Sequence, residues 1–564
     1  MTPTTETSAG AQVWAGRFVD FARRTGLAGR IWIAGLAVAA FGWALSSLWL
    51  PFGWDQGCFG YVGRVITQGG MPYRDAWDVK GPLTFYVFAA LESLLGRQMW
   101  GVRMLDLVLA AAAARSAFGI VSRFGSRFAA LGTALGVVLA FGSFGNWYTG
   151  GQPDGWAALL LIVVADLLTR RPEQAGAREV VIASFIIGSC ALLKPLYSGY
   201  LLLVVCSLWP ATGSERRVGL GRLALAAGAY LLPIVLLVGW IAAKGVLPDL
   251  FDAYFRFHVE RIQTEPEFQM SIVRVAQATL GVFTIVPLLA IVTPAAALGA
   301  GYLARDQRRA AAVIVAWALL SLALIGSQRK FLVQNYSWHP LYPPLLLLAG
   351  IGFARLWAAA SRAESAPARW LIVAAVLMCS KLVTRDPLAQ TGRWLKLVTG
   401  RTTQAQYWST FETKVPALEG RDATSFGFSV PRDFEIARYI EEHTRPDERV
   451  TIWSDPLANY LSDRRSITPI TLGAAFTTWG AADRRHRYRV ELLAGMHDPR
   501  VAYFGIPAKD LLPGDDEYNI PTYMPELATL LATDYEEVER FGDVRLFRHR
   551  GAAPPPAGTI PATP

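Results

Sequence analysis

The chain has 564 residues, of which 53% are hydrophobic and 17% charged, and its mean hydropathy is +0.30. A soluble domain carries roughly 25% charged residues, so the composition excludes an ordinary soluble protein. A net charge of +10 would suggest nucleic acid as a partner of a soluble chain. Here much of the Lys and Arg lies in short loops between apolar segments, which the positive-inside rule explains.

The first apolar segment, Ile31–Leu50, has twenty residues and no charge, which is the length of one membrane-spanning helix. The polar residues before it contain no short apolar region followed by a cleavage site, so we expect an uncleaved first span. Arg17, Arg23, Arg24 and Arg30 precede this span. They predict that residues 1–30 form a cytoplasmic N-terminal segment.

Eleven further apolar segments follow, which makes twelve in all. They lie at about 83–95, 103–122, 128–145, 156–169, 179–193, 196–210, 223–243, 276–303, 310–326, 339–357 and 370–384. We therefore expect a polytopic α-helical membrane protein with about 11–13 transmembrane helices over residues 31–385. An inside N-terminus and an outside C-terminus require an odd number of spans. Leu83–Leu95 is short for a perpendicular span, so it either joins its neighbour or stops partway.

Residues 386–550 change character, because charges recur every few residues. Arg432–Thr444 has the pattern of an amphipathic helix, and Arg449–Ser454, Val501–Gly505 and Val544–Arg548 have the pattern of strands. They predict a C-terminal α/β domain on the extracytoplasmic side, followed by a disordered Pro- and Ala-rich tail at 551–564. The basic run Arg484–Arg489 predicts a solvated helix face that could contact anionic lipid or polysaccharide.

The first outside loop, residues 51–82, carries two charges at its ends. Asp55 follows the first span and Lys80 precedes the next apolar segment, so we expect them to face each other near the membrane surface. A carboxylate can take a proton from an attacking hydroxyl, and a lysine can offset charge on a departing phosphate. The alternative is that Asp55 caps an interfacial helix and Lys80 extends its amine toward the headgroups.

The loop also carries an ordered motif. It consists of Gly70, Pro72, Tyr73, Asp75, Trp77, Asp78, Lys80, Pro82, Leu83 and Tyr86. This pattern resembles the C-type (GT-C) membrane glycosyltransferases, in the branch of protein O-mannosyltransferases, aminoarabinose transferases and lipopolysaccharide galacturonosyltransferases. The resemblance covers about residues 30–385 and implies the GT-C fold.

The resemblance implies that Asp55 is the general base and that Lys80 binds the polyprenyl phosphate of the donor. It places Tyr73, Asp75 and Asp78 among the substrate-binding residues. Relatives often have Glu before this Lys, with a role assigned to metal or acceptor handling. The chain has Val79 there, so that role is not transferred, although Asp78 could replace it. Gly81 stands where relatives often have Pro, and we expect it to loosen the turn.

Three later segments extend the resemblance. Asp154, in Gln152-Pro153-Asp154, and Lys194, in Leu192–Pro195, resemble outside residues of the family, with a helix cap and a headgroup-seeking lysine as the alternatives. A last basic and aromatic cluster suits a phosphate and a stacked sugar, or else an interfacial aromatic belt. It consists of Arg329, Lys330, Tyr336 and His339.

The resemblance implies an inverting transferase that moves a monosaccharide from polyprenyl phosphate to an envelope glycan, a glycolipid such as lipid A, or a protein. It implies the outer face of a bacterial cytoplasmic (inner) membrane, with no nucleic acid as a partner. No metal ligands are assigned and no cofactor is certain, but a divalent cation stays open. The alternatives are a flippase or transporter of lipid-linked glycans, an O-antigen polymerase or ligase, and an inactive scaffold whose tail binds envelope polymers.

Overall fold

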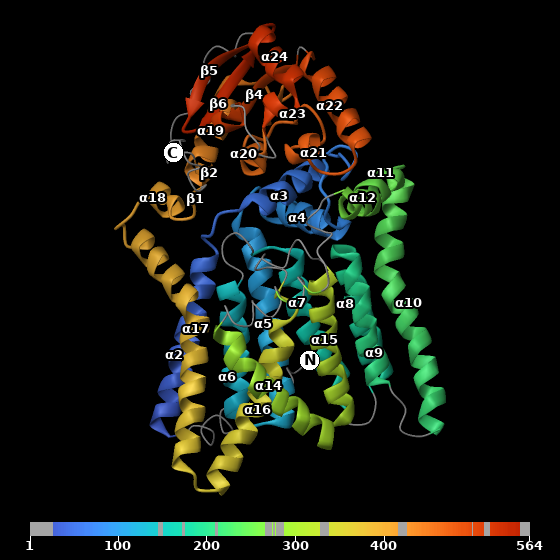
Figure 1. Cartoon of the computed structure of the whole chain (residues 1–564), viewed down its shortest axis with the longest axis vertical. Helices are drawn as coiled ribbons and strands as arrows, with labels where there is room; N and C mark the ends of the chain where they lie inside the picture. Colours follow the sequence, from blue (N-terminus) through green and yellow to red (C-terminus); the bar gives the residue numbers. More distant parts are fainter. Residues whose placement is uncertain are drawn as a thin grey trace, which may run out of the picture.

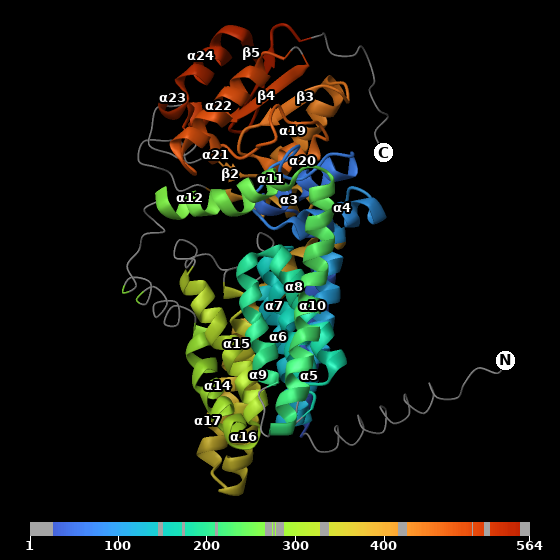
Figure 2. The same ribbon diagram turned by 90° about the vertical axis from the view of Figure 1, so that its right-hand side faces the viewer.

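A computed structural model describes residues 26–552 with gaps. The gaps are 145–149, 172–174, 209–212, 265–272, 274–276, 278–286, 328–337, 415–425, 499 and 512–518. Figures 1 and 2 show three layers: a bundle of long helices, a middle layer of short helices, and a C-terminal domain that contains the sheets. The N-terminal residues 1–25 and the tail after 552 lie outside the described residues.

The bundle contains the apolar helices. They are α2 (Leu27–Ser47), α5 (Trp100–Phe124), α6 (Arg127–Phe144), α7 (Pro153–Leu168), α8 (Ala177–Leu193), α9 (Leu201–Ser207, after the 3-10 turn η1, Pro195–Tyr200), α10 (Gly213–Ala243), α14 (Pro287–Asp306), α15 (Arg308–Ser327), α16 (Tyr342–Arg362) and α17 (Ala366–Val398). Among the described helices, seven are long and apolar enough to cross a membrane by length and composition. Large apolar side chains such as Trp370 and Leu371 are 72% exposed, as expected where lipid is the solvent.

The connections between several bundle helices are basic and lie at one end. Arg123 and Arg127 flank the turn from α5 to α6, Arg305 and Arg308 flank the turn from α14 to α15, and Arg362 ends α16. Figure 1 shows this end of the bundle opposite the C-terminal domain. The arginines are therefore separated from the acidic loop residues by the length of the bundle, as the positive-inside pattern predicts.

The middle layer contains α3 (Trp54–Thr67), α4 (Pro82–Leu95), α11 (Leu247–Phe251), the π-helix η2 (Asp252–Arg256) and α12 (Phe257–Thr264). The segment 83–95, which the sequence leaves open because it is short for a span, therefore lies in the middle layer and does not cross the bundle. Gly81, just before α4, bonds to the outer end of α8, and Arg97, just after it, bonds to Leu461 of the C-terminal domain. Both ends of α4 thus lie on one side of the bundle.

The C-terminal domain is a small mixed α/β unit. Its elements are α18 (Gln404–Ser409), β1 (Thr413–Lys414), β2 (Phe426–Phe428), α19 (Val430–His443), β3 (Arg449–Ile452), α20 (Pro456–Leu461), α21 (Ala474–Thr477), α22 (Ala482–Met496), β4 (Val501–Pro507), η6 (Ala508–Leu511), α23 (Ile520–Tyr523), α24 (Pro525–Asp534), β5 (Tyr535–Phe541) and β6 (Val544–His549). The main sheet has the order β3-β4-β6-β5, with β3 and β4 parallel and the other neighbours antiparallel. The predicted amphipathic helix and three strands are confirmed as α19, β3, β4 and β6.

Two features of this region differ from expectation. Helix α17 continues to Val398, past the predicted end of the last span at residue 384, because hydropathy detects where apolar residues end and not where the helix ends. The basic run on α22 is only partly a solvated face, because the Arg484 side chain is fully buried against carboxylates of the middle layer.

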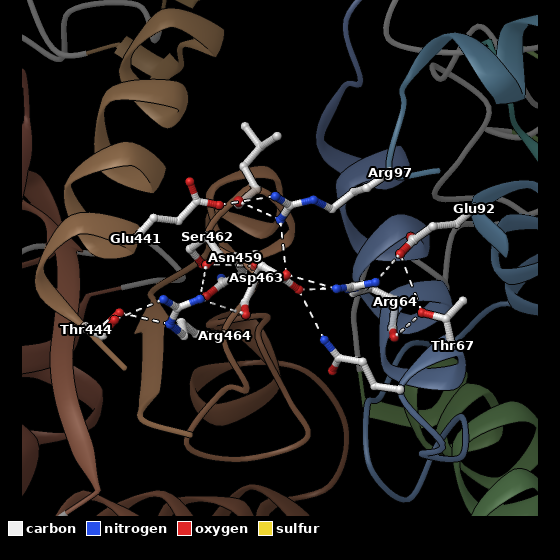
Figure 3. A network of polar contacts seen from close by, with 12 residues as sticks. Arg64, Thr67, Glu92, Arg97, Glu441, Thr444, Asn459, Ser462, Asp463 and Arg464 are labelled. Atoms are coloured by element: carbon white, nitrogen blue, oxygen red, sulfur yellow. Dashed lines mark hydrogen bonds and ion pairs between the residues drawn. The ribbon is translucent and has the colours of Figure 1, made fainter. Parts of the chain in front are cut away.

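The middle layer and the C-terminal domain share one buried core and a polar network. Gly57 on α3 approaches α20 so closely that a Cβ there would lie 2.7 Å from the Leu457 nitrogen. Figure 3 shows Arg64 of α3 between Glu92 of α4, at 3.0 Å, and Asp463, at 2.7 Å. The C-terminal domain is therefore packed directly on the helix that carries Asp55.

Candidate active site

The structure brings Asp55 and Lys80 together from opposite ends of the loop 51–82. Asp55 lies in the first turn of α3, and Lys80 precedes Gly81, the N-cap of α4. Lys80 Nζ is 4.0 Å from Asp55 Oδ2, and the side chains are 25% and 16% exposed. The positive end of the α3 dipole also favours the Asp55 carboxylate.

The segment before α7 fixes the Asp55 carboxylate. Gln152 Nε2–H donates to Asp55 Oδ2 at 2.7 Å. The neighbouring Gln56 caps α3 by accepting from the Gly53 N–H at 2.8 Å, and its amide donates to the Gly150 carbonyl. The N-terminus of α3 is thereby attached to the segment that leads into α7.

A second acid–lysine pair lies beside the first. Asp154, in the first turn of α7, accepts hydrogen bonds from Lys194 Nζ at 3.0 Å and from the Tyr197 hydroxyl. Lys194 follows the last residue of α8, and Tyr197 lies in the 3-10 turn η1. Lys80 interacts electrostatically with both Asp154 and Lys194. Two carboxylates and two lysines therefore share one region at the end of the bundle that faces the middle layer.

The polar side chains of residues 71–78 serve largely to shape the loop. Tyr73 has a positive φ of 70°, a region that bulky residues rarely adopt, and its buried hydroxyl donates to the Lys80 carbonyl at 2.8 Å. The Asp75 carboxylate accepts from the Met71 N–H at 2.7 Å and pairs with Arg74 at 2.8 Å. The Tyr73 and Asp75 side chains therefore bond to the backbone of the loop and stabilise its turn.

Asp78 contacts the backbone of Lys80. Its Oδ1 accepts the Lys80 N–H at 2.9 Å, and burial raises the pKa of this carboxyl to about 6. The nearby Lys80 charge acts in the opposite direction and favours the ionised form. Asp78 therefore orients the residue that carries the amine, and its carboxylate is engaged in the loop.

Gly81 does not loosen the turn, which corrects the expectation from its replacement of Pro. The Gly81 N–H donates to the Leu193 carbonyl at 3.3 Å. A Cβ at this position would lie inside the contact distance of the Leu192 and Leu193 carbonyl oxygens. Glycine lets the loop touch the end of α8, and this contact brings Lys80 close to Lys194.

The late basic and aromatic cluster is located only in part. His339 is 2% exposed, and its ring lies 6.0 Å from Phe141 and 6.4 Å from Tyr342, measured between ring centroids. Arg329, Lys330 and Tyr336 lie outside the described residues. The structure therefore places His339 in an aromatic environment within the bundle.

Sequence reasoning missed several supporting residues. Gln152 and Tyr197 flank predicted residues but carry no motif of their own. Arg103 and Asp106 lie on α5, where Arg103 Nη2–H donates to the Pro51 carbonyl at 2.7 Å and Asp106 accepts the Trp156 indole N–H at 2.7 Å. A charged pair inside an apolar helix was the signal that could have identified them.

An apolar groove of about 470 Å³ lies next to the chain segments that follow Lys80 and Lys194. Pro82 and Pro195, each within two residues of one lysine, form part of its wall, together with Leu192 and aromatic residues of α11 and η2. Among the described residues, no group of three or more His, Cys, Asp or Glu side chains is placed to hold a metal ion. The region therefore combines charged groups with an adjacent apolar surface.

No protein-family model matches the chain, and no curated protein matches its sequence. Solved structures do match. ArnT from Cupriavidus metallidurans bound to undecaprenyl phosphate superposes with a TM-score of 0.58 at 17% identity, covering 93% of this chain and 99% of that one. ArnT in the apo state gives 0.57 at 16% identity, covering 93% and 100%. An oligosaccharyltransferase complex from Archaeoglobus fulgidus with zinc and sulfate gives 0.44 at 12% identity, covering 84% and 68%.

The match to ArnT extends over nearly the whole of both chains, including the C-terminal domain that the sequence resemblance did not cover. At this identity the similarity concerns the fold. The chain therefore has the fold of aminoarabinose transferase, a C-type (GT-C) membrane glycosyltransferase.

Proposed function

We propose that the protein transfers a monosaccharide from a polyprenyl-phosphate donor to a hydroxyl of a cell-envelope acceptor at the outer face of the cytoplasmic membrane. The observation that carries this proposal is the 4.0 Å approach of Lys80 to Asp55, beside Lys194 and the apolar groove. A cation next to a carboxylate suits a reaction in which one group receives a proton and the other receives a phosphate.

In the proposed reaction the Asp55 carboxylate takes the proton of the acceptor hydroxyl. The acceptor oxygen attacks the anomeric carbon, and the bond from that carbon to the phosphate oxygen breaks, with inversion. Polyprenyl phosphate leaves with the bonding electrons, and Lys80 offsets the charge that develops on it. Attack and departure occur in one step. The products are the glycosylated acceptor, polyprenyl phosphate and the proton held by Asp55.

The groove beside the lysines supports a lipid-linked donor. Its walls are apolar and include Pro82, two residues after Lys80, so a phosphate at Lys80 would have its prenyl chain against apolar residues. The undecaprenyl phosphate bound to ArnT has this combination of a charged head and an apolar chain. The sugar and the acceptor remain open within the class of envelope glycan, glycolipid or protein.

The test is Asp55→Asn, which keeps the shape of the side chain and removes the base. Membranes that contain the variant are supplied with radiolabelled polyprenyl-phosphate monosaccharides, and transfer is measured at equal protein level. We expect a loss of about 10³-fold, within the range of general base catalysis. Asp498→Asn is the matched control, because the Asp498 carboxylate pairs with Arg500 within the C-terminal domain at 2.6 Å, and it should leave transfer unchanged.

A flippase or transporter would give a different outcome. In that case Asp55→Asn would abolish movement of the lipid-linked sugar across the bilayer, and transfer from a donor already at the outer face would remain unchanged.

Mass spectrometry of envelope glycans and lipid A, with and without the gene, identifies the transferred sugar by the missing mass.

A further inference from the structure

Helix α12 connects the C-terminal domain to the loop that carries Lys80. The Phe257 ring meets the Trp77 ring edge-on, with centroids 5.0 Å apart. The next residue, His258, places its Nε2 3.1 Å from the Val79 carbonyl oxygen, one residue before Lys80. One turn of α12 therefore contacts the loop by ring packing and by a hydrogen bond.

The His258 bond has a defined direction. Burial lowers the pKa of His258 to about 4, and the charges of Arg261, Lys80 and Lys194 act in the same direction. The imidazole is therefore neutral near pH 7, and its Nε2–H donates to the carbonyl. A neutral donor restrains the Val79–Lys80 peptide and adds no further positive charge beside the two lysines.

Arg484 of α22 fixes α12 from the other side. Its guanidinium bonds to both oxygens of Glu260, through Nε at 2.7 Å and Nη2 at 2.9 Å. It also bonds to both oxygens of Asp252, with Nη2 2.9 Å from Oδ1. Bidentate pairing to two carboxylates is geometry that arginine supplies and lysine cannot. The Arg484 side chain is fully buried, and its partners Glu260 and Asp252 are 14% and 35% accessible.

The π-helix explains how one arginine reaches both acids. Asp252 and Glu260 are eight residues apart, which in a regular α-helix corresponds to about 80° beyond two full turns. The segment η2, Asp252–Arg256, turns through a smaller angle per residue because its hydrogen bonds span five residues. This change of register brings the two carboxylates onto one face, toward α22.

The C-terminal domain also contacts the loop directly. The Trp77 backbone N–H donates to the Pro469 carbonyl at 2.9 Å, and Trp77 forms a parallel bridge with Ile470. The segment 77–79 therefore lies between α12 and residues 469–470, and Arg484 ties α12 to the same domain. Lys80 follows directly from this restrained segment.

We propose that the C-terminal domain positions Lys80, with Arg484 and His258 as positioning residues that act through α12. The kinetic part of this inference rests on the proposed transfer reaction. The mechanical part concerns the loop alone. Lys80 has a flexible four-carbon side chain, so its amine reaches a defined place only when its backbone is held.

The kinetic test uses His258→Phe, which removes the donor, and Arg484→Lys, which keeps the charge and loses the double bidentate contact. We expect the donor KM to rise about tenfold in each variant while the acceptor KM stays within twofold. His258→Gln, which can still donate, should recover most of the loss. In the double variant the effects should be less than additive, because both residues act on one element.

Arg97→Lys is the matched control. Arg97 joins α4 to the C-terminal domain through Glu441 at 3.1 Å, as Figure 3 shows, and its other hydrogen bond is to the Leu461 carbonyl of the same domain. We expect this variant to leave the donor KM unchanged. A general weakening of the domain contact would instead raise the donor KM in both arginine variants, and this result would overturn the specific role of Arg484.

Hydrogen exchange gives a readout that does not depend on transfer. Backbone exchange over residues 72–82 should be faster in His258→Phe and Arg484→Lys than in the wild type and in Arg97→Lys. Unchanged exchange in Arg484→Lys would overturn the positioning role. If the variants exchange faster while the wild-type protein itself transfers no sugar, the proposed reaction is rejected and the positioning of the loop by α12 stands.

Discussion

The two acid–lysine pairs of the site have the same composition and different environments. Asp55 and Lys80 are 4.0 Å apart and partly exposed, and the Asp55 side chain is 16% accessible. Asp154 and Lys194 are 3.0 Å apart, the Asp154 side chain is 3% accessible, and Tyr197 gives it another donor. The Asp55 carboxylate is therefore accessible to a substrate, while the Asp154 carboxylate is buried and bonded to Lys194 and Tyr197.

Both carboxylates lie in the first turn of a helix, so the helix dipole favours each of them equally. The difference comes from the elements around them. Asp55 lies in the middle layer, where its side chain is more accessible. Asp154 begins α7 and is covered by the end of α8 and by η1. We therefore expect changes in the first pair to affect rate, and changes in the second to affect stability.

After Asp55→Asn, the largest effect should come from Lys80→Met, which keeps the chain length and removes the charge. We expect kcat/KM for the donor to fall about 10²- to 10³-fold, because the departing phosphate loses its cation. The thermal unfolding midpoint should hardly change, since the Lys80 side chain is partly exposed and its amine lies 4.0 Å from Asp55. Steady-state transfer and unfolding of the purified protein measure the two quantities. A large loss of stability would mean that the first pair is structural.

Asp154→Asn should have the opposite profile. The Asp154 side chain is 3% accessible and Lys194 is 25% accessible, so loss of the charge in this partly buried pair should lower the unfolding free energy by about 1–3 kcal/mol. Transfer per folded molecule should fall less than tenfold. Unfolding followed by circular dichroism, combined with transfer at a temperature where the variant is folded, separates the effects. Lost transfer with unchanged stability would assign Asp154 a direct part in the reaction.

A smaller effect is expected from Gln152→Ala. The Gln152 amide donates to Asp55 Oδ2, so its loss frees the carboxylate to rotate and should reduce kcat about tenfold. Because Gln152 is buried, its truncation also lowers stability, and transfer is therefore compared per folded molecule. Gln68→Ala is the matched control, because the Gln68 amide donates to Asp463 at an exposed position, at 3.1 Å. Equal rates for the two variants would show that Asp55 needs no orientation by Gln152.

The smallest effect should come from chelation of divalent cations. Val79 offers no side-chain ligand, and the Asp78 carboxylate is engaged by the Lys80 N–H. We therefore expect EDTA to change transfer less than about twofold. The measurement is transfer before and after chelation, followed by addition of Mg²⁺. A tenfold loss that Mg²⁺ restores would show that a cation takes part with the first pair.

Much of the fold followed from local patterns. The apolar segments, their basic connections, helix α19 and strands β3, β4 and β6 depend on hydrophobic periodicity and length, which the sequence displays directly. The fold class also followed from the loop motif, and the superposition on ArnT confirms it. The sequence alone leaves the segment 83–95 open, because an apolar helix of fourteen residues can lie in a core as well as cross a membrane.

The sequence by itself determined a polytopic membrane chain, a separate C-terminal α/β domain, and the closeness of Asp55 and Lys80, which one short loop connects. Only the tertiary structure decided that Asp154 is satisfied, that Gly81 must be small, and that Arg484 lies buried against Asp252 and Glu260. These features depend on contacts between residues far apart in the chain. Residue type and spacing carry no information on which distant partner, if any, will neutralise a charge.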